Sequence, residues 1–224
     1  MRLMISILLS LMCIFTFART PKEAMERLKV HNVPFNGTLS NSLDINLASF
    51  IEVDDGILSH KVYSNAQLTE WLDMKKYTDF GYYCRIQFDN PSHNNNYLLI
   101  SLNDAGDFWT DIMASVDSDG NIMDYIDACI TSDSKFGIAN IMQYRIAANG
   151  DVIISRIVPT STTSIPLGDL KDFHGYRQDT TYRLDQNGKF HIVDVVKYVP
   201  QLYMAQMMAD NNYHVWNGNE TPAE

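Results

Sequence analysis

The sequence predicts an α+β fold, in which a meandering antiparallel β-sheet carries helices from both ends of the chain on one face. Three observations predict it. A turn pattern with Asn or Asp before Gly occurs three times between apolar residues. Period-two alternation and β-branched runs dominate from about residue 82 to 199, and apolar residues at helical spacing flank that stretch. A sheet curled into a half-barrel is the alternative form of this fold.

The composition is that of an ordinary globular domain. The 224 residues are 46% hydrophobic and 20% charged, which excludes a disordered or fibrous protein. The formal net charge is -10, and no basic run is longer than Lys75-Lys76. Because such a field repels phosphate backbones, we expect no nucleic-acid partner.

Residues 1–18 have the features of an export signal. Arg2 precedes an uncharged apolar run from Leu3 to Phe17, and Ala18 ends a small-residue pattern that signal peptidases cleave. A membrane-spanning helix needs roughly 20 apolar residues, so this run is short for that role. We expect a secreted or periplasmic protein with no membrane span after cleavage, and an uncleaved anchor is the alternative.

The mature chain is expected to form one β-rich domain over residues 19–216, followed by a flexible tail over 217–224. It retains Cys84 and Cys129 in a compartment where disulfides persist. Both lie on expected strands. A disulfide between them and a pair of free thiols are both open.

Two helices are expected before the sheet. Pro21 opens the first, which runs to Lys29 with Ala24 on its apolar face. Ser64 caps the second, over residues 65–77. Between them, the sequence of residues 32–62 fits strands and loops equally well.

The sheet begins at Tyr82, with a first hairpin closed by a polar loop over residues 90–96. Gly tolerates positive φ, and Asn and Asp do so to a lesser degree, so Asn-Gly and Asp-Gly favour tight turns. The sequence therefore predicts three further hairpins, which turn at Asp119-Gly120, Asn149-Gly150 and Asn187-Gly188.

The expected strands differ in the polarity of the side chains on their two faces. Residues 108–116 alternate so that Asp111, Met113 and Ser115 form a wetter side. Residues 152–154 and 192–196 are apolar on both sides, which is typical of central strands covered on both faces. Pro200 ends the last strand, and a Met-rich helix is expected over residues 201–210.

No stretch matches a diagnostic catalytic, metal or nucleotide motif. The acidic residues around Gly120 lack the Gly and Glu that an EF-hand loop requires. The histidine-acid pairs, His191 with Asp194 and His174 with Asp172, lack the spacing of metal sites. We therefore assign no catalytic residue, metal or cofactor.

Aromatic residues interleaved with amides are the remaining surface signal. Such platforms suit sugar rings or a protein partner, and His174 stands in an expected loop. The candidate ligand-binding residues are Tyr83, Trp109, His174, Tyr176, Tyr213 and Trp216.

The order of elements resembles that of small secreted proteins of Bacteroidetes. The resemblance is carried by the export signal, the helix opening Thr20-Pro21-Lys22-Glu23-Ala24, and hairpins such as Tyr182 to Phe190. It implies an exported bacterial protein that faces the periplasm or cell surface, and it transfers no active-site residue.

These features favour an exported, non-enzymatic binding or interaction protein of the cell envelope, whose partner is a protein, a glycan or an apolar small molecule. A carrier of an apolar ligand such as a lipid is the first alternative, with the Met-rich segment as adaptable lining. A hydrolase whose site no motif reveals is the second. A large apolar cavity would favour the carrier, and carboxylates clustered in a cleft would favour the enzyme.

Overall fold

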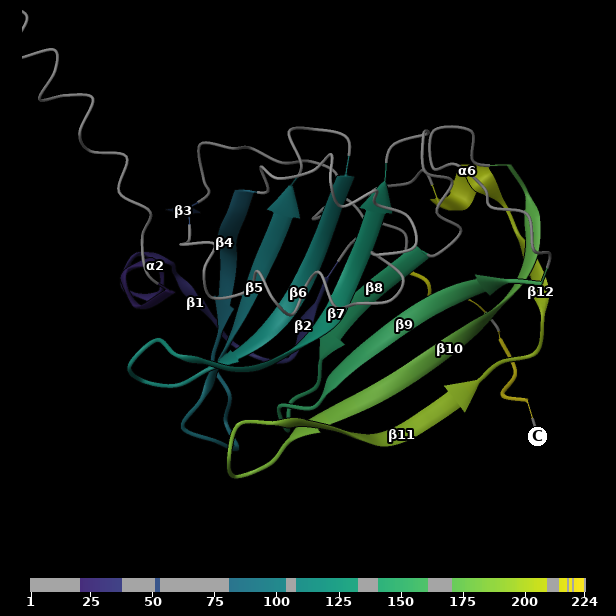
Figure 1. The fold of residues 1–224 in the computed structure, drawn as a ribbon. Helices are drawn as coiled ribbons and strands as arrows, with labels where there is room; N and C mark the ends of the chain where they lie inside the picture. Colours follow the sequence, from purple (N-terminus) through teal and green to yellow (C-terminus); the bar gives the residue numbers. More distant parts are fainter. Residues whose placement is uncertain are drawn as a thin grey trace, which may run out of the picture.

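β-strands make up most of the described chain (Figure 1). The computed structural model describes residues 21–37, 51–52, 81–103, 108–132, 141–160, 171–208, 214–216, 218 and 220–223. The expected export signal and the helix expected over residues 65–77 lie outside this part of the chain.

The first sheet has the strand order β1-β4-β5-β6-β7, with β3 beside β4. Its neighbours pair antiparallel, except that β1 runs parallel to β4. The strands are β1 (Val30–His31), β3 (Ile51–Glu52), β4 (Gly81–Phe88), β5 (Asn96–Asn103), β6 (Phe108–Val116) and β7 (Ile122–Ser132).

The second sheet has the order β11-β10-β9-β8-β2, and β12 pairs with β10 beyond the end of β11. All of its pairs are antiparallel. The strands are β2 (Phe35–Asn36), β8 (Ile141–Ile146), β9 (Val152–Pro159), β10 (Phe173–Leu184), β11 (Phe190–Lys197) and β12 (Gln201–Tyr203).

The predicted α+β class is wrong. The described chain is mostly β with two short helices, α2 (Pro21–Arg27) and α6 (Ala205–Met208). Its strands divide between two sheets, so neither the single meander with helices on one face nor its half-barrel form is observed. The turn patterns predicted which strands form hairpins, but they carry no information on where one sheet ends and the next begins.

The three Gly-containing turns are confirmed. Gly120, Gly150 and Gly188 have φ values of 84°, 87° and 73°. In each turn the glycine N–H donates to the carbonyl three residues earlier, over 3.1, 2.9 and 3.1 Å. Only glycine adopts this left-handed backbone without strain, which explains the repeated sequence pattern.

The two sheets share one hydrophobic core at the end where these turns gather, at the lower left of Figure 1. The Phe35 ring lies 4.7 Å from that of Phe88, and the Tyr97 ring lies 5.9 Å from that of Phe190, measured between centroids. Both pairs join the first sheet to the second. The buried Ala24 adds α2 to the same core.

Three predictions about individual elements fail. The expected wetter side of β6 is buried, with Asp111 only 2% exposed. β11 was expected to be a covered central strand, but it lies at the sheet edge with most of its side chains exposed. Residues 201–203 form β12 rather than the start of a helix, and α6 begins only at Ala205.

Candidate functional site

A group of exposed apolar side chains lies along the edge of the second sheet. Their exposed fractions range from 43% to 59%, and Val30 is the other large hydrophobic side chain exposed to this degree in the described chain. We call this group the apolar edge surface. It consists of Ile192, Val193, Val195, Val199, Leu202, Met204 and Met207.

This surface is electrically neutral within an acidic protein. Residues 190–208 contain one acid, Asp194, and one base, Lys197, whereas the whole chain has a net charge of -10. β11 has β10 on one side and the second sheet ends there, and most of its side chains are exposed. An apolar strand that would suit a sheet centre therefore stands at an edge.

The far end of the chain already pairs with part of this edge. Tyr198 forms an antiparallel bridge with Pro222. The Val199 N–H donates to the Thr221 carbonyl over 2.8 Å, and the Ala223 N–H donates to the Lys197 carbonyl over 2.7 Å. The edge thus accepts an extended backbone next to β11. This contact involves residues expected to form a flexible tail.

Buried charges hold that segment in place. Arg177 of β10 is 5% exposed and donates to Glu220 over 2.6 Å and to the Val215 carbonyl over 3.0 Å. Its Nε lies 3.1 Å from Asp179 Oδ1, and its guanidinium carbon lies 3.8 Å from the centre of the Tyr198 ring. One guanidinium therefore joins β10 to Val215 and Glu220, which follow it in the chain by 38 and 43 residues.

Residues 214–216 cover the outer face of the same sheet. The Val215 N–H donates to Gln143 Oε1 over 2.8 Å. The Trp216 ring stacks on His214, with centroids 4.7 Å apart, and lies 5.1 Å from the Arg145 guanidinium carbon. Because Val215 is fully buried, this face of β8 to β10 is covered rather than free.

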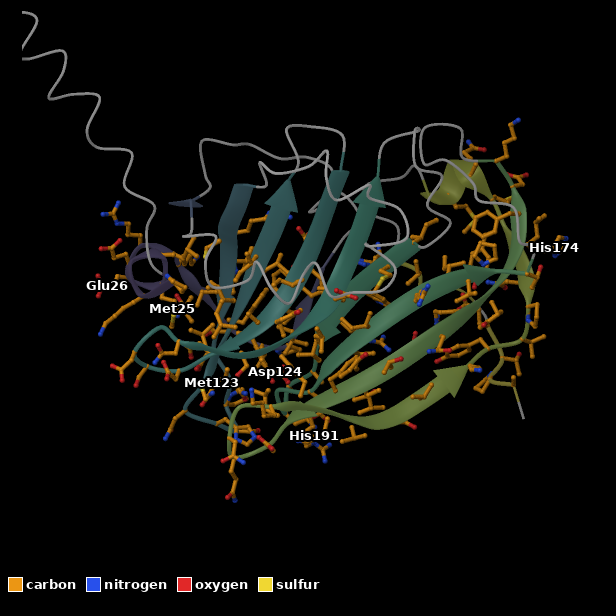
Figure 2. The ribbon with its side chains drawn as sticks, in the orientation of Figure 1. Met25, Glu26, Met123, Asp124, His174 and His191 are labelled. Atoms are coloured by element: carbon orange, nitrogen blue, oxygen red, sulfur yellow. The ribbon has the colours of Figure 1, made fainter. Side chains whose placement is uncertain are left out.

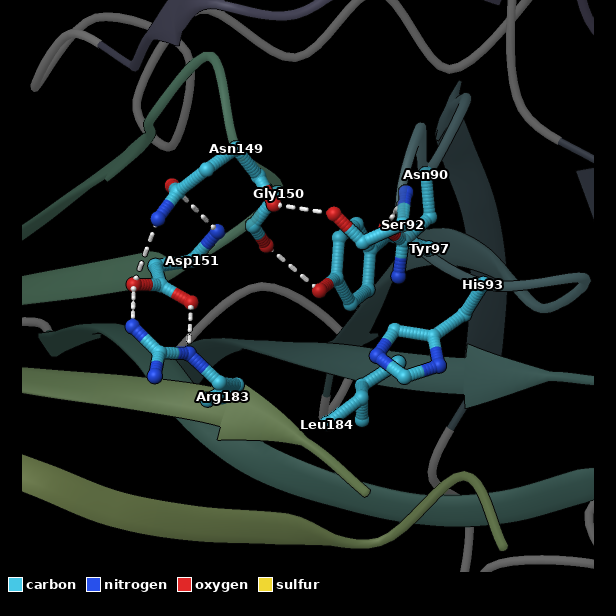
Figure 3. A pocket seen from close by; sticks show the side chains of 9 residues that line it. All are labelled: Asn90, Ser92, His93, Tyr97, Asn149, Gly150, Asp151, Arg183 and Leu184. Atoms are coloured by element: carbon cyan, nitrogen blue, oxygen red, sulfur yellow. Dashed lines mark hydrogen bonds and ion pairs between the residues drawn. The ribbon is translucent and has the colours of Figure 1, made fainter. Parts of the chain in front are cut away.

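A small polar pocket lies where the sheets meet, with a volume of about 130 Å³ (Figure 3). Asp151 accepts two hydrogen bonds from Arg183, over 2.8 and 2.7 Å. These bonds are the main reason that the pKa of Asp151 is below its usual value. The pocket is lined by Asn90, Ser92, His93, Tyr97, Asn149, Gly150, Asp151, Arg183 and Leu184.

Most polar groups of this pocket bind one another. The Tyr97 hydroxyl donates to the Gly150 carbonyl over 2.6 Å, and Ser92 donates to the Asn149 carbonyl over 2.6 Å. Burial raises the pKa of Tyr97. The buried Asn90 Nδ2 is the exception, since it has no hydrogen-bond partner. The pocket is thus chiefly a junction that ties the first sheet to the second.

A buried ion pair lies on the face of the first sheet that carries Tyr97. Arg85 donates to Asp111 over 2.9 Å and to Ser101 over 3.2 Å, and Ser101 donates to Asp111. Desolvation raises the pKa of Asp111, whereas Arg85 and Ser101 oppose that shift. Mutual satisfaction of the three groups explains why a polar cluster is tolerated in the interior.

The candidate ligand-binding residues whose side chains are described lie at separate places on the second sheet. His174 of β10 is exposed and pairs with Leu202 of β12, at the far end of the sheet from His191 (Figure 2). Tyr176 is half-buried opposite Val158 of β9. Trp216 lies on the covered outer face. For the others, β4 contains Tyr83, β6 contains Trp109, and Tyr213 is outside the described residues.

Cys84 does not form a disulfide. It is a buried free cysteine, and burial raises the pKa of its thiol to about 12. Cys129 lies on β7, three strands away from β4 in the sheet order. Neighbouring strands are about 4.8 Å apart, so the two Cα atoms lie well beyond the roughly 7 Å that a disulfide spans.

Sequence reasoning missed the apolar edge surface and Arg177. The run of β-branched residues in β11 was visible, but apolar residues on both faces are normally buried, so the pattern pointed away from a surface. The neutral stretch over residues 190–208 was the signal that could have found it. Nothing local marks Arg177, because Glu220 follows it by 43 residues.

The described part of the chain brings together no group of three or more His, Cys, Asp or Glu side chains that could hold a metal ion. In the same part, no helix has both the length and the apolar character needed to cross a membrane. Comparison of the chain with protein-family models, curated proteins and solved structures gives no match.

Proposed function

We propose that this chain is an exported, non-enzymatic interaction protein of the cell envelope, which binds a protein partner through the apolar edge surface. The observation that carries the proposal is the concentration of exposed large hydrophobic side chains between residues 192 and 207. Soluble monomers rarely leave such patches uncovered, and contiguous ones mark interaction sites.

The chemistry of the surface favours a protein over a glycan. Its side chains are aliphatic or thioether groups, whereas sugar sites use aromatic rings flanked by hydrogen-bonding groups. Methionine adapts its shape to an apolar partner, and Met204 and Met207 lie at one end of the surface. The charge pattern supports the same reading, because depletion of charge is typical of interface centres.

Site-specific photo-crosslinking in the native cell tests the proposal. A benzophenone side chain placed at Leu202 should give one discrete adduct with a protein. The same probe at the exposed Ser118, in the β6–β7 turn, serves as the matched control. Adducts of equal yield at both positions, or none at Leu202, would contradict a role for the apolar edge surface.

Export is tested separately by mass spectrometry of the protein from fractionated cells. The arrangement of Arg2, the apolar run to Phe17 and Ala18 supports cleavage after Ala18. A mass that begins at Arg19, found outside the cytoplasm, is the expected result. Recovery of the intact chain from the cytoplasmic fraction would count against export without affecting the interaction surface.

A further inference from the structure

We infer that the partner at this surface is a second copy of the chain, and that two β11 strands pair antiparallel about a two-fold axis. The inference rests on the proposed function and names its partner. The result would be one continuous sheet running from the second sheet of one copy into that of the other.

The backbone of β11 shows which groups are available for such pairing. The Tyr198 N–H points inward and donates to the Arg177 carbonyl over 2.9 Å, whereas the Lys197 carbonyl and the Val199 N–H point outward to residues 221–223. Backbone groups alternate along an antiparallel strand. The N–H and carbonyl of Val195 therefore point outward.

At the other end of β11, the alternation of inward and outward backbone groups is shifted by one residue, because a β-bulge interrupts the strand. The Phe190 N–H points outward, since it donates to Asp124 of β7 over 2.9 Å, and Figure 2 labels Asp124 near this strand. Alternation then makes Ile192 the next outward residue. The register shift opposite Thr181 and Tyr182 leaves Val193 out of the pairing, so the outward positions are Ile192 and Val195.

These two outward positions are self-complementary. A two-fold axis between Val193 and Asp194 sets Ile192 across from the partner's Val195, and symmetry repeats the pair. Each pair exchanges two backbone hydrogen bonds. Within one copy, Ile192 pairs with Tyr182 and Val195 with Thr180, so both side chains stand on one face and the apolar pairs are in contact.

Charge explains why the second copy meets at this strand. Two copies with a net charge of -10 repel one another over most of their surfaces. β11 contains one acid and one base, so it brings two copies together where that repulsion is least. It also has no proline, and its one lysine stands at its last residue, so it lacks two of the usual protections of a sheet edge. The pairing of residues 221–223 beside it shows that this edge does accept a strand.

Sedimentation equilibrium of the mature chain over a range of concentrations tests the inference. We expect a reversible dimer that Val195→Lys converts to a monomer. Val30→Lys is the matched control, because Val30 is exposed to the same degree as Val195 but lies on β1 of the first sheet, outside the apolar edge surface. A monomer at every concentration, or a dimer that survives Val195→Lys, would overturn the inference.

Cysteine trapping tests the register itself. Under mild oxidation, a mixture of the Ile192→Cys and Val195→Cys single variants should form a covalent dimer containing one of each, and each variant alone should cross-link far less. Equal cross-linking of each variant alone would contradict this register. In the Leu202 photo-crosslinking experiment, an adduct with a different protein would overturn the second copy as partner and leave the proposed function standing.

Discussion

Arg177 has few alternatives to the contacts that it makes. Its guanidinium is nearly enclosed, it faces Asp179 and Glu220, and the Glu220 side chain is fully buried. Removing one member of such a cluster leaves an uncompensated charge in a low dielectric, and this costs more than the ion pair itself contributes.

We predict that Arg177→Ala lowers the free energy of unfolding by about 3 to 5 kcal/mol, because Glu220 and Asp179 then lose their shared cation. Urea denaturation measures this. The same variant should raise amide hydrogen exchange at Val199 and Ala223, whose N–H groups join the two segments. Arg177→Lys, which keeps the charge, should fall between Arg177→Ala and the native chain. A loss below about 1 kcal/mol, the range of exposed ion pairs, would contradict this account.

Asp185 has a half-buried carboxylate with an unusual pKa. The backbone N–H of Lys189 and then the side chain of His191 hydrogen-bond to it, which lowers its pKa to about 2. A folded pKa below the ordinary value of about 3.9 means that the charged form stabilises the fold at higher pH, and that this stability is lost as the pH falls from about 4 towards 2.

The corresponding prediction concerns the pH dependence of unfolding. Asp185→Asn should be less stable than the native chain at pH 7, and the difference should shrink in acid as the native carboxyl takes up a proton. Thermal unfolding at a series of pH values measures this. Asp194→Asn on the neighbouring strand is the control. A difference that stays constant down to pH 2 would show that the carboxylate charge is not the cause.

At the scale of elements, the three Gly-containing turns share a backbone conformation but differ in the side chain three residues before the glycine. Asp117 and Asp185 each accept two backbone N–H groups within their own turn. The turn at Gly150 has Ala147 at the position that Asp117 and Asp185 hold in the other two. In that turn the carboxylate is supplied by Asp151, which follows the glycine and is bound to Arg183.

The turn at Gly150 also lies very close to the first sheet. A Cβ on Gly150 would lie 2.6 Å from Asn90 Oδ1, and the residue has a φ of +87°. We predict that Gly150→Ala lowers the free energy of unfolding by about 1 to 3 kcal/mol, from the left-handed backbone together with displacement of Asn90. Chemical denaturation measures it. Ala148→Ser in the same exposed turn should change the free energy by less than about 0.5 kcal/mol.

β11 shows why an element's place in a sheet is harder to predict than its existence. Its residues have high β-propensity, so the strand itself could be predicted. Whether a strand is central or at an edge depends on what pairs with its second side, and no residue of β11 records that. An apolar strand at a free edge is consistent with a partner that covers it.

At the scale of the whole molecule, the described hairpin turns all lie at one end. The turns at Gly120, Gly150 and Gly188 and the loop over residues 90–96 gather there (Figure 1). The sheets share their main core at the same end, together with the Tyr97 and Gly150 contact. Opening the sheets apart would therefore require disruption of the core and of the turns together.

Cys84 offers a probe of that opening. Its side chain is fully buried in the main core, and its thiol pKa is raised to about 12, so almost no reactive thiolate is present at pH 8. We predict that iodoacetamide modifies Cys84 only as the chain unfolds globally. Peptide mapping across a urea series should give the same midpoint as circular dichroism. Rapid labelling in native buffer would contradict this.

The features that could be predicted from the sequence are those encoded within a few residues. The Asp-Gly and Asn-Gly turns, the hairpin around residues 90–96 and the helix at Pro21 are of this kind. The division into two sheets and the burial of Asp111 depend on residues that meet only in the folded chain. The same holds for the apolar edge surface. Its β11 residues were predicted correctly as a strand but assigned to a covered position, whereas Leu202 was predicted in a helix and lies on β12.

The contact between Arg177 and Glu220 also fixes an order of events. During synthesis, Arg177 leaves the ribosome 43 residues before Glu220. At ordinary rates of translation this is a delay of about 2 to 9 seconds. For most of that interval the guanidinium lacks both partners, and the outer face of the second sheet lacks Val215, which follows Arg177 by 38 residues. A nascent chain halted in this window would present that uncovered face to chaperones.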